Sequence, residues 1–317
     1  MSPSADYPAP PLYQPSSPEK TATLRLRDVI NTKFNLALRS YEDLYHWSTA
    51  HVDAFWSTVW DETSIVGDKG THVVDPASPS ANPEWFKEAK INWAENMLQC
   101  RSSERIALIQ ATEPTKDLPS PALRQVSYAD LYSMVANIVS ALLLNGLKPG
   151  DRVGAYCSNC IENVAACLAT TALGGIWVSA AADFGPEGVL ERFEQVQPRF
   201  IFAVDAVVYN AKVHPHLPKL STLLAGLAGK VATPKVIIIH AIPQQEDQAG
   251  WAKDWVSWDN FLASGKVSQL GRTPSGEIEW RRGSFDWPVW ILFSSGTTGM
   301  LALNTSYAST KPFLRKM

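Results

Sequence analysis

The chain has 317 residues, of which 45% are apolar, 10% aromatic and 19% charged, and its formal net charge is −3. This length allows about two domains, and the apolar content, with 12 Trp, is sufficient for a sizeable core, so global disorder is excluded. The balance of 28 basic and 31 acidic residues argues against a nucleic-acid partner. Four Cys are too few for a disulfide scaffold and fit a reducing compartment.

The beginning of the chain carries no export signal in its composition. Residues 1–19 contain six Pro and no apolar run, so we expect a disordered tail over residues 1–20. The uncharged stretch from Asn163 to Ala182 is long enough to suggest a membrane span. Its Ala, Thr, Gly and Ser content predicts buried core instead, so we expect no membrane span and a cytoplasmic protein.

Residues 21–99 show aromatic and apolar side chains at helical spacing. Ser40 has the residue type and position of an N-cap for a helix over residues 41–47. The next helix is expected to carry its apolar residues on one face, formed by Val52, Phe55, Trp56, Val59 and Trp60. A loop rich in Gly, Pro, Asp and Ser covers residues 67–83. We therefore predict a helical, aromatic-rich N-terminal region over residues 21–99.

After residue 100 the pattern changes to strands that alternate with helices. Residues 105–110 read as a strand, and Ser127-Tyr-Ala-Asp130 resembles a capping box that begins a helix ending at Gly146. The elements that follow are a strand over 153–157, a helix over 161–173, a strand over 176–180, a helix over 186–195, a strand over 200–204, a helix over 217–227 and a strand over 236–240. Apolar strands between helices predict an α/β fold, with a largely parallel sheet and flanking helices.

The last predicted strand leads directly into a polar loop. Residues 241–288 read as a Trp-rich connection, and Val289-Trp-Ile-Leu-Phe293 is the strongest buried-strand pattern in the chain. The loop that follows consists of Ser294, Ser295, Gly296, Thr297, Thr298 and Gly299. We expect an incomplete α/β domain over residues 100–299 and a divergent tail over residues 300–317.

This hexapeptide is the candidate site for binding nucleotide phosphates. Gly296 and Gly299 permit positive φ and close approach of the backbone, while the four hydroxyl residues add donors to the successive N–H groups. The loop is not a Walker A motif, because no Gly-Lys-Ser/Thr follows. A polar turn without a ligand is the alternative. The preceding buried strand and the density of hydroxyls favour a phosphate site.

Other motifs are weaker candidates for a function. Cys157-Ser-Asn-Cys160 has redox-motif spacing but lacks the Trp-Cys-Gly-Pro context of thioredoxins. His214-Pro-His216 has no third ligand, so no metal site is predicted. Asp183-Phe-Gly185 has the residues of the kinase metal-binding triplet, but the other kinase motifs are absent from the sequence. Core packing is the favoured interpretation of the Trp residues.

The sequence around the loop resembles the phosphate-binding core motif of adenylate-forming acyl-CoA synthetases. Tyr41-Glu-Asp-Leu-Tyr-His-Trp-Ser48 and Ile91-Asn-Trp-Ala-Glu-Asn96 are similar to the N-terminal region of acetyl- and acetoacetyl-CoA synthetases. Asp183-Phe-Gly185, with the segments 189–193 and 198–205, points to the acetoacetate branch. The resemblance implies the N-terminal part of the adenylate-forming fold and covers about residues 24–299.

The resemblance also implies an activity and its small-molecule partners. An acid such as acetoacetate would be activated by ATP as an acyl-adenylate, and CoA would then displace AMP, as in lipid and fatty acid metabolism. Residues 294–299 would hold the β- and γ-phosphates with Mg²⁺. Acetyl-CoA synthetase or another short-chain acyl-CoA synthetase is the nearest alternative within the resemblance. The oligomeric state has no signal in the sequence.

The sequence departs from the family after Gly299. The family continues its motif with Pro-Lys, where this chain has Leu301 and Ala302, and the tail to Met317 resembles nothing in the family. On this basis we expect a truncated chain without catalytic residues of its own, with apolar sheet edges exposed by the truncation. Two interpretations remain open: an inactive piece of an acid–CoA ligase, and a non-catalytic remnant with at most weak phosphate binding.

Overall fold

The computed structural model describes residues 13–75, 77–79, 83–116, 120, 122–241, 251–293 and 303–307. The chain divides into two compact units. The N-terminal unit comprises Met1–Ile65 and Lys69–Phe86, and the α/β unit comprises Val66–Asp68 and Lys87–Met317. In the described part of the chain, every helix is too short or too polar to span a bilayer.

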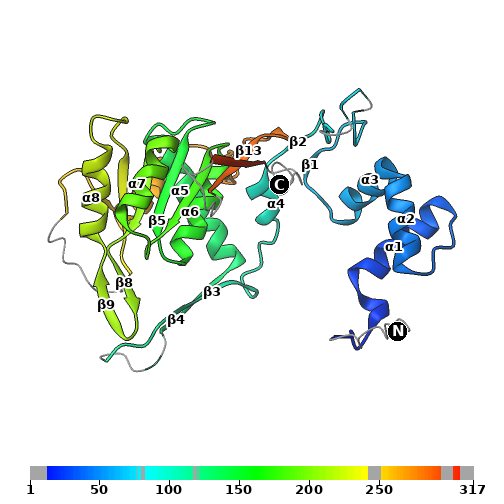
Figure 1. Ribbon diagram of the computed structural model, residues 1–317, viewed down its shortest axis with the longest axis horizontal. Helices are drawn as coiled ribbons and strands as arrows, with labels where there is room; N and C mark the ends of the chain where they lie inside the picture. Colours follow the sequence, from blue (N-terminus) through cyan, green and yellow to red (C-terminus); the bar gives the residue numbers. More distant parts are fainter. Residues whose placement is uncertain are drawn as a thin grey trace, which may run out of the picture. The chain divides into compact units, whose positions relative to one another are not determined.

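The N-terminal unit contains its helices between Pro18 and Glu62. A single 3₁₀ turn, η1 (Pro18–Lys20), precedes α1 (Ala22–Phe34), α2 (Tyr41–Ala50) and α3 (Val52–Glu62). Ser40 and Asp43 form a capping box at the start of α2, which confirms the predicted N-cap. Ile30, Leu44 and Trp47 form the buried centre of the helices. The helices are the blue elements of Figure 1.

A seven-stranded sheet forms the centre of the α/β unit. Its order is β11-β10-β7-β5-β6-β13-β14, and every neighbouring pair is parallel except β13–β14. The strands are β5 (Arg152–Cys157), β6 (Ile176–Ala181), β7 (Phe200–Val204), β10 (Lys235–Ile239), β11 (Val256–Ser257), β13 (Pro288–Phe293) and β14 (Leu303–Tyr307). The predicted α/β fold with a largely parallel sheet is confirmed.

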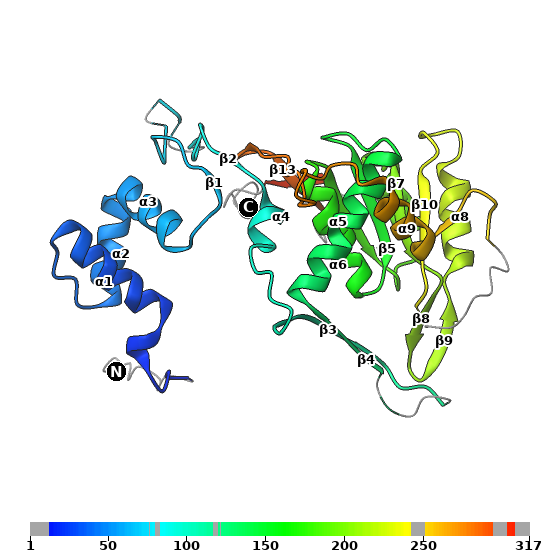
Figure 2. The ribbon, with the colours of Figure 1, turned by 180° about the vertical axis from the view of Figure 1, so that it is seen from behind.

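Helices cover both faces of this sheet. One face packs against α5 (Tyr128–Leu144), α6 (Ile161–Ala172) and α9 (Trp258–Ser268), and the other against α7 (Pro186–Val196) and α8 (Leu217–Leu227). Successive side chains of a strand point to opposite faces, so Ala155 and Phe202 lie in the first core while Tyr156 and Ala203 lie in the second. Figures 1 and 2 show the two helix layers from opposite sides.

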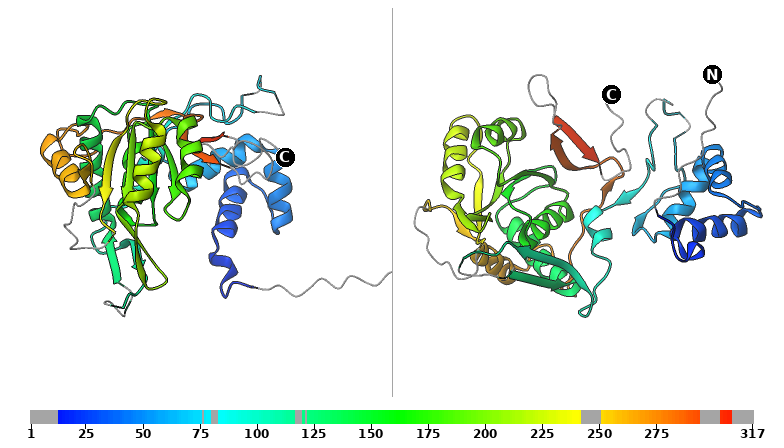
Figure 3. Two further views of the ribbon diagram at one scale, coloured as in Figure 1. Left: turned by 60° about the vertical axis from the view of Figure 1, so that its left-hand side comes forward. Right: turned by 60° about the horizontal axis from the view of Figure 1, so that its bottom comes forward.

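Two antiparallel ribbons extend beyond the same end of the main sheet (Figure 3). One pairs β3 (Ile106–Thr112) with β4 (Ala122–Ser127), and the other pairs β8 (Ala206–Tyr209) with β9 (Lys212–Pro215). Because β8 follows the carboxyl end of β7 along the chain, this end is the carboxyl edge of the parallel sheet.

A small sheet and a short helix link the beginning of the α/β unit to its last segment. β1 (Gly67–Asp68) and β12 (Gly283–Ser284) both pair with β2 (Lys90–Ile91), and α4 (Trp93–Met97) follows β2. Asn92 donates from Nδ2 to the carbonyl oxygens of Thr171 and Arg281, at 3.0 and 2.8 Å. Glu95 accepts two bonds from Arg282, at 2.7 and 2.8 Å. These contacts fix the segment that leads into β13 against α4 and α6.

The sequence pattern missed a helix in the Trp-rich connection. Residues 241–288 contain β11 and α9, whose N-cap Ser257 accepts a bond from the N–H of Asn260. The helix α9 was missed because Gly265 is typical of a loop. In the structure this glycine lies where α9 crosses α5. A Cβ atom there would lie 1.8 Å from the carbonyl oxygen of Asn137, so the close approach of the helices requires glycine. The β8–β9 ribbon was also missed.

The helix crossing gives the first testable prediction. Gly265→Ala should lower the free energy of unfolding by about 2–3 kcal/mol, because the added methyl group cannot fit against the α5 backbone. Ser264→Ala changes the neighbouring residue and adds no atom at the crossing, so its effect should stay within about 0.5 kcal/mol. Urea unfolding followed by Trp fluorescence measures both. Equal stability of the two variants would contradict the close approach of α9 to α5.

Candidate functional site

The carboxyl edge of the sheet is where the loops after β5, β6, β7, β10 and β13 meet. In parallel sheets covered by helices on both faces, ligands bind outside this edge. The predicted phosphate-binding residues 294–299 follow β13 directly, but they lie outside the described residues. The structure does describe the point from which they start. β13 ends at Phe293, and its Trp290 pairs with Trp177 of the neighbouring β6.

The loop after β6, residues 182–185, is held by side chains from two other elements. Tyr156 of β5 donates its hydroxyl to the carbonyl oxygen of Phe184. Lys219 of α8 donates from Nζ to the carbonyl oxygens of Ala182 and Phe184, at 3.1 and 3.4 Å. Burial, with the negative charges of Glu187 and Asp183, raises the pKa of Tyr156 to about 12. The hydroxyl therefore stays protonated and keeps donating at neutral pH.

An arginine joins this loop to the end of β13. The guanidinium Cζ of Arg192, on α7, lies 5.2 Å from the ring centroid of Phe184 and 5.5 Å from that of Phe293. Its Nη1 donates to the carbonyl oxygen of Gly188, one turn earlier in the helix. The cation is thus directed toward the carboxyl edge, next to the residue that precedes Ser294.

A buried histidine packs against Tyr156, which holds the same loop. His216 is 1% exposed, and its ring packs edge-on against Tyr156 with the centroids 4.3 Å apart. Burial and the nearby charge of Lys219 lower the pKa of His216 to about 4. The imidazole is therefore neutral at pH 7, and its Nε2 atom has no hydrogen-bond partner among the described residues.

A small polar pocket lies farther along the carboxyl edge. Its volume is 200 Å³. It lies near the carboxyl end of β5, where the strand order reverses: β6 pairs with one side of β5, and the next strand, β7, pairs with the other. Such a reversal of strand order is a common place for a ligand. The lining includes Glu113, Glu162 and His240. Glu162 pairs with Arg124 at 2.6 Å, so its charge is balanced beside the pocket.

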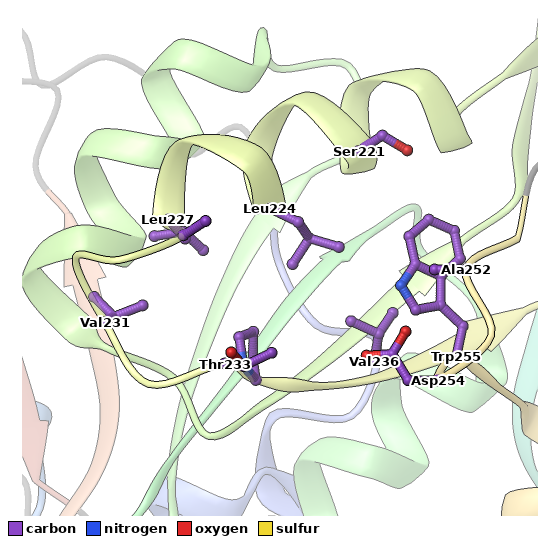
Figure 4. Close-up of a pocket in the computed structure, with 11 residues that line it drawn as sticks. Ser221, Leu224, Leu227, Val231, Thr233, Val236, Ala252, Asp254 and Trp255 are labelled. Atoms are coloured by element: carbon purple, nitrogen blue, oxygen red, sulfur yellow. The ribbon is translucent and has the colours of Figure 1, made fainter.

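A second pocket lies at the opposite end of the sheet (Figure 4). It has a volume of 320 Å³ between the end of α8, the start of β10 and the segment before β11. Leu224 and Leu227 of α8 line one part of it, and Val236, Asp254 and Trp255 lie close together in another. Trp255 comes from the Trp-rich connection, and the pocket lies at the start of β10, away from the carboxyl ends of the strands.

The structure shows the surroundings of the weaker sequence motifs. Burial raises the pKa of the Cys157 thiol well above its usual value and that of Cys160 to about 12, which disfavours thiolate chemistry. No group of three or more metal-ligating side chains forms among the described residues. Asp183-Phe-Gly185 lies in the loop after β6, where Phe184 contacts Arg192.

Sequence reasoning missed the three side chains that hold the loop after β6. Tyr156, Arg192 and Lys219 lie on a strand and two helices that were predicted, but each has a residue type that is common on a solvated surface or in a core. All three side chains contact the backbone or a ring of the loop after β6. These contacts form only when the strands and helices pack together. A signal was available for Arg192 alone, since an Arg beside Phe193 on an otherwise amphipathic helix can lie near the helix–sheet boundary.

Two family models match this chain. A family described as "AMP-binding enzyme" matches residues 99–301, and one described as "Acetyl-coenzyme A synthetase N-terminus" matches residues 41–97. The first match covers well over half of the chain. The chain belongs to the AMP-binding enzyme family.

Individual relatives narrow the similarity to one branch. Acetoacetyl-CoA synthetase from Xenopus tropicalis is 36% identical over 291 residues, which are 91% of this chain and 42% of the relative. Malonamoyl-CoA synthetase from Penicillium aethiopicum is 32% identical over 300 residues, 91% of this chain and 39% of the relative. The solved acetoacetyl-CoA synthetase from Streptomyces lividans superposes with a TM-score of 0.78 at 28% identity, covering 94% of this chain and 43% of that one. The chain spans about two fifths of the length of these relatives.

The buried histidine gives the second prediction. An unfolded-state His titrates near pH 6.5 and the folded His216 near 4, so between these values the unfolded chain binds more protons. Stability should therefore fall as the pH drops from about 6.5 to about 4, by an amount on the order of 3 kcal/mol. His216→Phe should remove this part of the pH dependence in urea unfolding curves. His214→Asn, two residues away at an exposed position, should retain it.

Proposed function

We propose that this chain supplies the first part of an acetoacetyl-CoA synthetase-like acid–CoA ligase, with residues 294–299 as the loop that binds the ATP phosphates. The observation that carries the proposal is the end of β13. The partly buried strand β13, parallel to β6, stops at Phe293 on the carboxyl edge, beside the loop after β6, and the Gly- and hydroxyl-rich residues follow at once. The family match over residues 99–301 includes all of them.

In this proposal the reaction has two steps. A carboxylate oxygen of the acid attacks the α-phosphorus of ATP, the bond to the bridging oxygen breaks, and pyrophosphate leaves. The thiol of CoA then attacks the acyl carbon of the acyl-adenylate, loses its proton and releases AMP. Backbone N–H groups and hydroxyls of residues 294–299 would stabilise the charge that develops on pyrophosphate, together with Mg²⁺ on the β- and γ-phosphates.

Acetoacetate is the proposed acid, because acetoacetyl-CoA synthetases are among the relatives with 36–38% identity. Acetate or another short acid is the alternative, and the malonamoyl-CoA synthetase relative shows by its name that the similarity extends to other acids. We place the protein in lipid or fatty acid metabolism. All four Cys are unpaired, which supports a reducing compartment such as the cytoplasm.

A polypeptide limited to residues 1–317 is proposed to be catalytically inactive. Stabilising the transition state requires groups on both sides of the α-phosphate. The loop after β13 would supply one side, and the relatives are more than twice as long as the stretch that matches them. Weak phosphate binding without turnover is then the expected behaviour of this polypeptide, and it is also what the non-catalytic remnant would show.

The third prediction tests the phosphate loop on this polypeptide. Thr297→Val should weaken binding of Mg-pyrophosphate about tenfold, because a hydrogen bond to a charged group contributes about 1.5–3 kcal/mol. Ser275→Ala removes a hydroxyl from an exposed polar turn, where Ser275 bonds Thr273 at 2.8 Å, and should leave the affinity unchanged. Isothermal titration calorimetry measures both variants.

The same preparation tests the proposed lack of turnover. With acetoacetate, ATP and CoA present, residues 1–317 should release no AMP above the enzyme-free background. Equal affinities of wild type and Thr297→Val for pyrophosphate would overturn the loop assignment. AMP release that depends on all three substrates would confirm the ligase activity but overturn the proposed inactivity of this polypeptide.

A further inference from the structure

We propose that Arg192 is a positioning residue: it fixes the carboxyl end of β13 against the loop after β6, and thereby sets where the predicted phosphate loop begins. The role of that loop in binding phosphate rests on the proposed function. The contact of Arg192 with the two rings rests on the described residues alone. Arg192, Phe184 and Phe293 come from α7, the loop after β6 and the last residue of β13.

The direction of α7 brings the guanidinium to the edge. α7 begins at Pro186, directly after the loop that follows β6, so its first turn lies at the carboxyl edge. Side chains on a helix lean toward its N-terminus, and Arg192 donates to the carbonyl oxygen of Gly188, one turn back. A Cβ atom at Gly188 would lie 3.3 Å from Nη1, so the glycine leaves room for this path.

The cation contacts an aromatic ring from each of the two segments that it joins. Its Cζ lies 5.2 Å from the centroid of Phe184 and 5.5 Å from that of Phe293, both within the range of cation–π attraction. Arg192 is half-buried, and Phe293 packs against the core formed with α7 and α8. Partial removal from water strengthens such contacts, and a planar guanidinium stacks on aromatic faces.

The Phe184 side of the contact is itself held firmly. Tyr156 and Lys219 bond to the carbonyl oxygen of Phe184, and Lys219 also bonds to that of Ala182. Phe184 therefore offers Arg192 a fixed surface, although its own side chain is 43% exposed. The other partner, Phe293, is the last described residue before Ser294. A shift of its backbone would move the start of the predicted phosphate loop.

The experiment is a double-mutant cycle between Arg192 and Phe293 on residues 1–317. The variants are Arg192→Met, Phe293→Leu, the double variant and Arg192→Lys. Arg105→Met is the matched control, because Arg105 Cζ lies 5.6 Å from the Tyr128 ring and neither residue touches β13. The two readouts are amide hydrogen exchange of residues 289–293 and calorimetric affinity for Mg-pyrophosphate. Circular dichroism establishes that each variant folds.

Arg192→Met should speed exchange at the end of β13 and lower the pyrophosphate affinity, each by about three- to tenfold, as expected for the loss of two cation–π contacts. Arg192→Lys should fall between Met and wild type. In the Phe293→Leu background, Arg192→Met should cause no further loss, because the arginine acts through that ring. Arg105→Met should leave both readouts unchanged. If Arg192→Met does not fold, the Arg192→Lys cycle gives the same comparison.

Other outcomes overturn one proposal or the other. Additive losses of affinity in the double variant would show that Arg192 contacts phosphate directly or acts only on global stability. Unchanged exchange at residues 289–293 would show that it does not fix β13. Wild-type protein that binds no pyrophosphate would contradict the phosphate-loop assignment. The exchange cycle would still confirm or refute the fixing of β13 in that case.

Discussion

Burial of both faces of the parallel sheet is the constraint on which the structure depends. Tyr156, Phe200 and Phe202 are buried on strands with helices above and below, so side-chain packing fills the centre of both sheet faces. Polar chemistry is confined to the strand ends. Because six strands run in one direction, segments far apart in the sequence, such as those after β6 and β13, reach the same edge.

Charged side chains of both signs lie along that edge. Near β6 and β13, the cations Arg192 and Lys219 bind the loop after β6. Near β5 and β7, the polar pocket is lined by Glu113 and Glu162. Asp183 and Glu187 lie near the first two cations, and Arg124 pairs with Glu162 at 2.6 Å, so charge alone does not separate the two places.

Much of the fold could be predicted because local patterns and tertiary packing agree. The Ser40 and Ser127 caps, the Pro186 helix start and the apolar run of β7 each specify their own element. Prediction failed where tertiary contact overrides local preference: Gly265 lies within α9 because α5 approaches closely. The candidate loop could be identified because its chemistry is contiguous in sequence. Its supporting side chains could not, since Tyr156, Arg192 and Lys219 converge only after the strands and helices pack.

We predict that phosphate groups bind at the carboxyl edge of the sheet, where β13 ends. The most direct measurement is a titration of isotopically labelled residues 1–317 with Mg-pyrophosphate, followed by backbone amide chemical shifts in NMR spectra. Shifts concentrated in residues 293–299 and in the loop over residues 182–185 are the expected result. Shifts that instead gather at the pocket of Leu224 and Trp255, at the other end of the sheet, would contradict the assignment of the carboxyl edge as the nucleotide site.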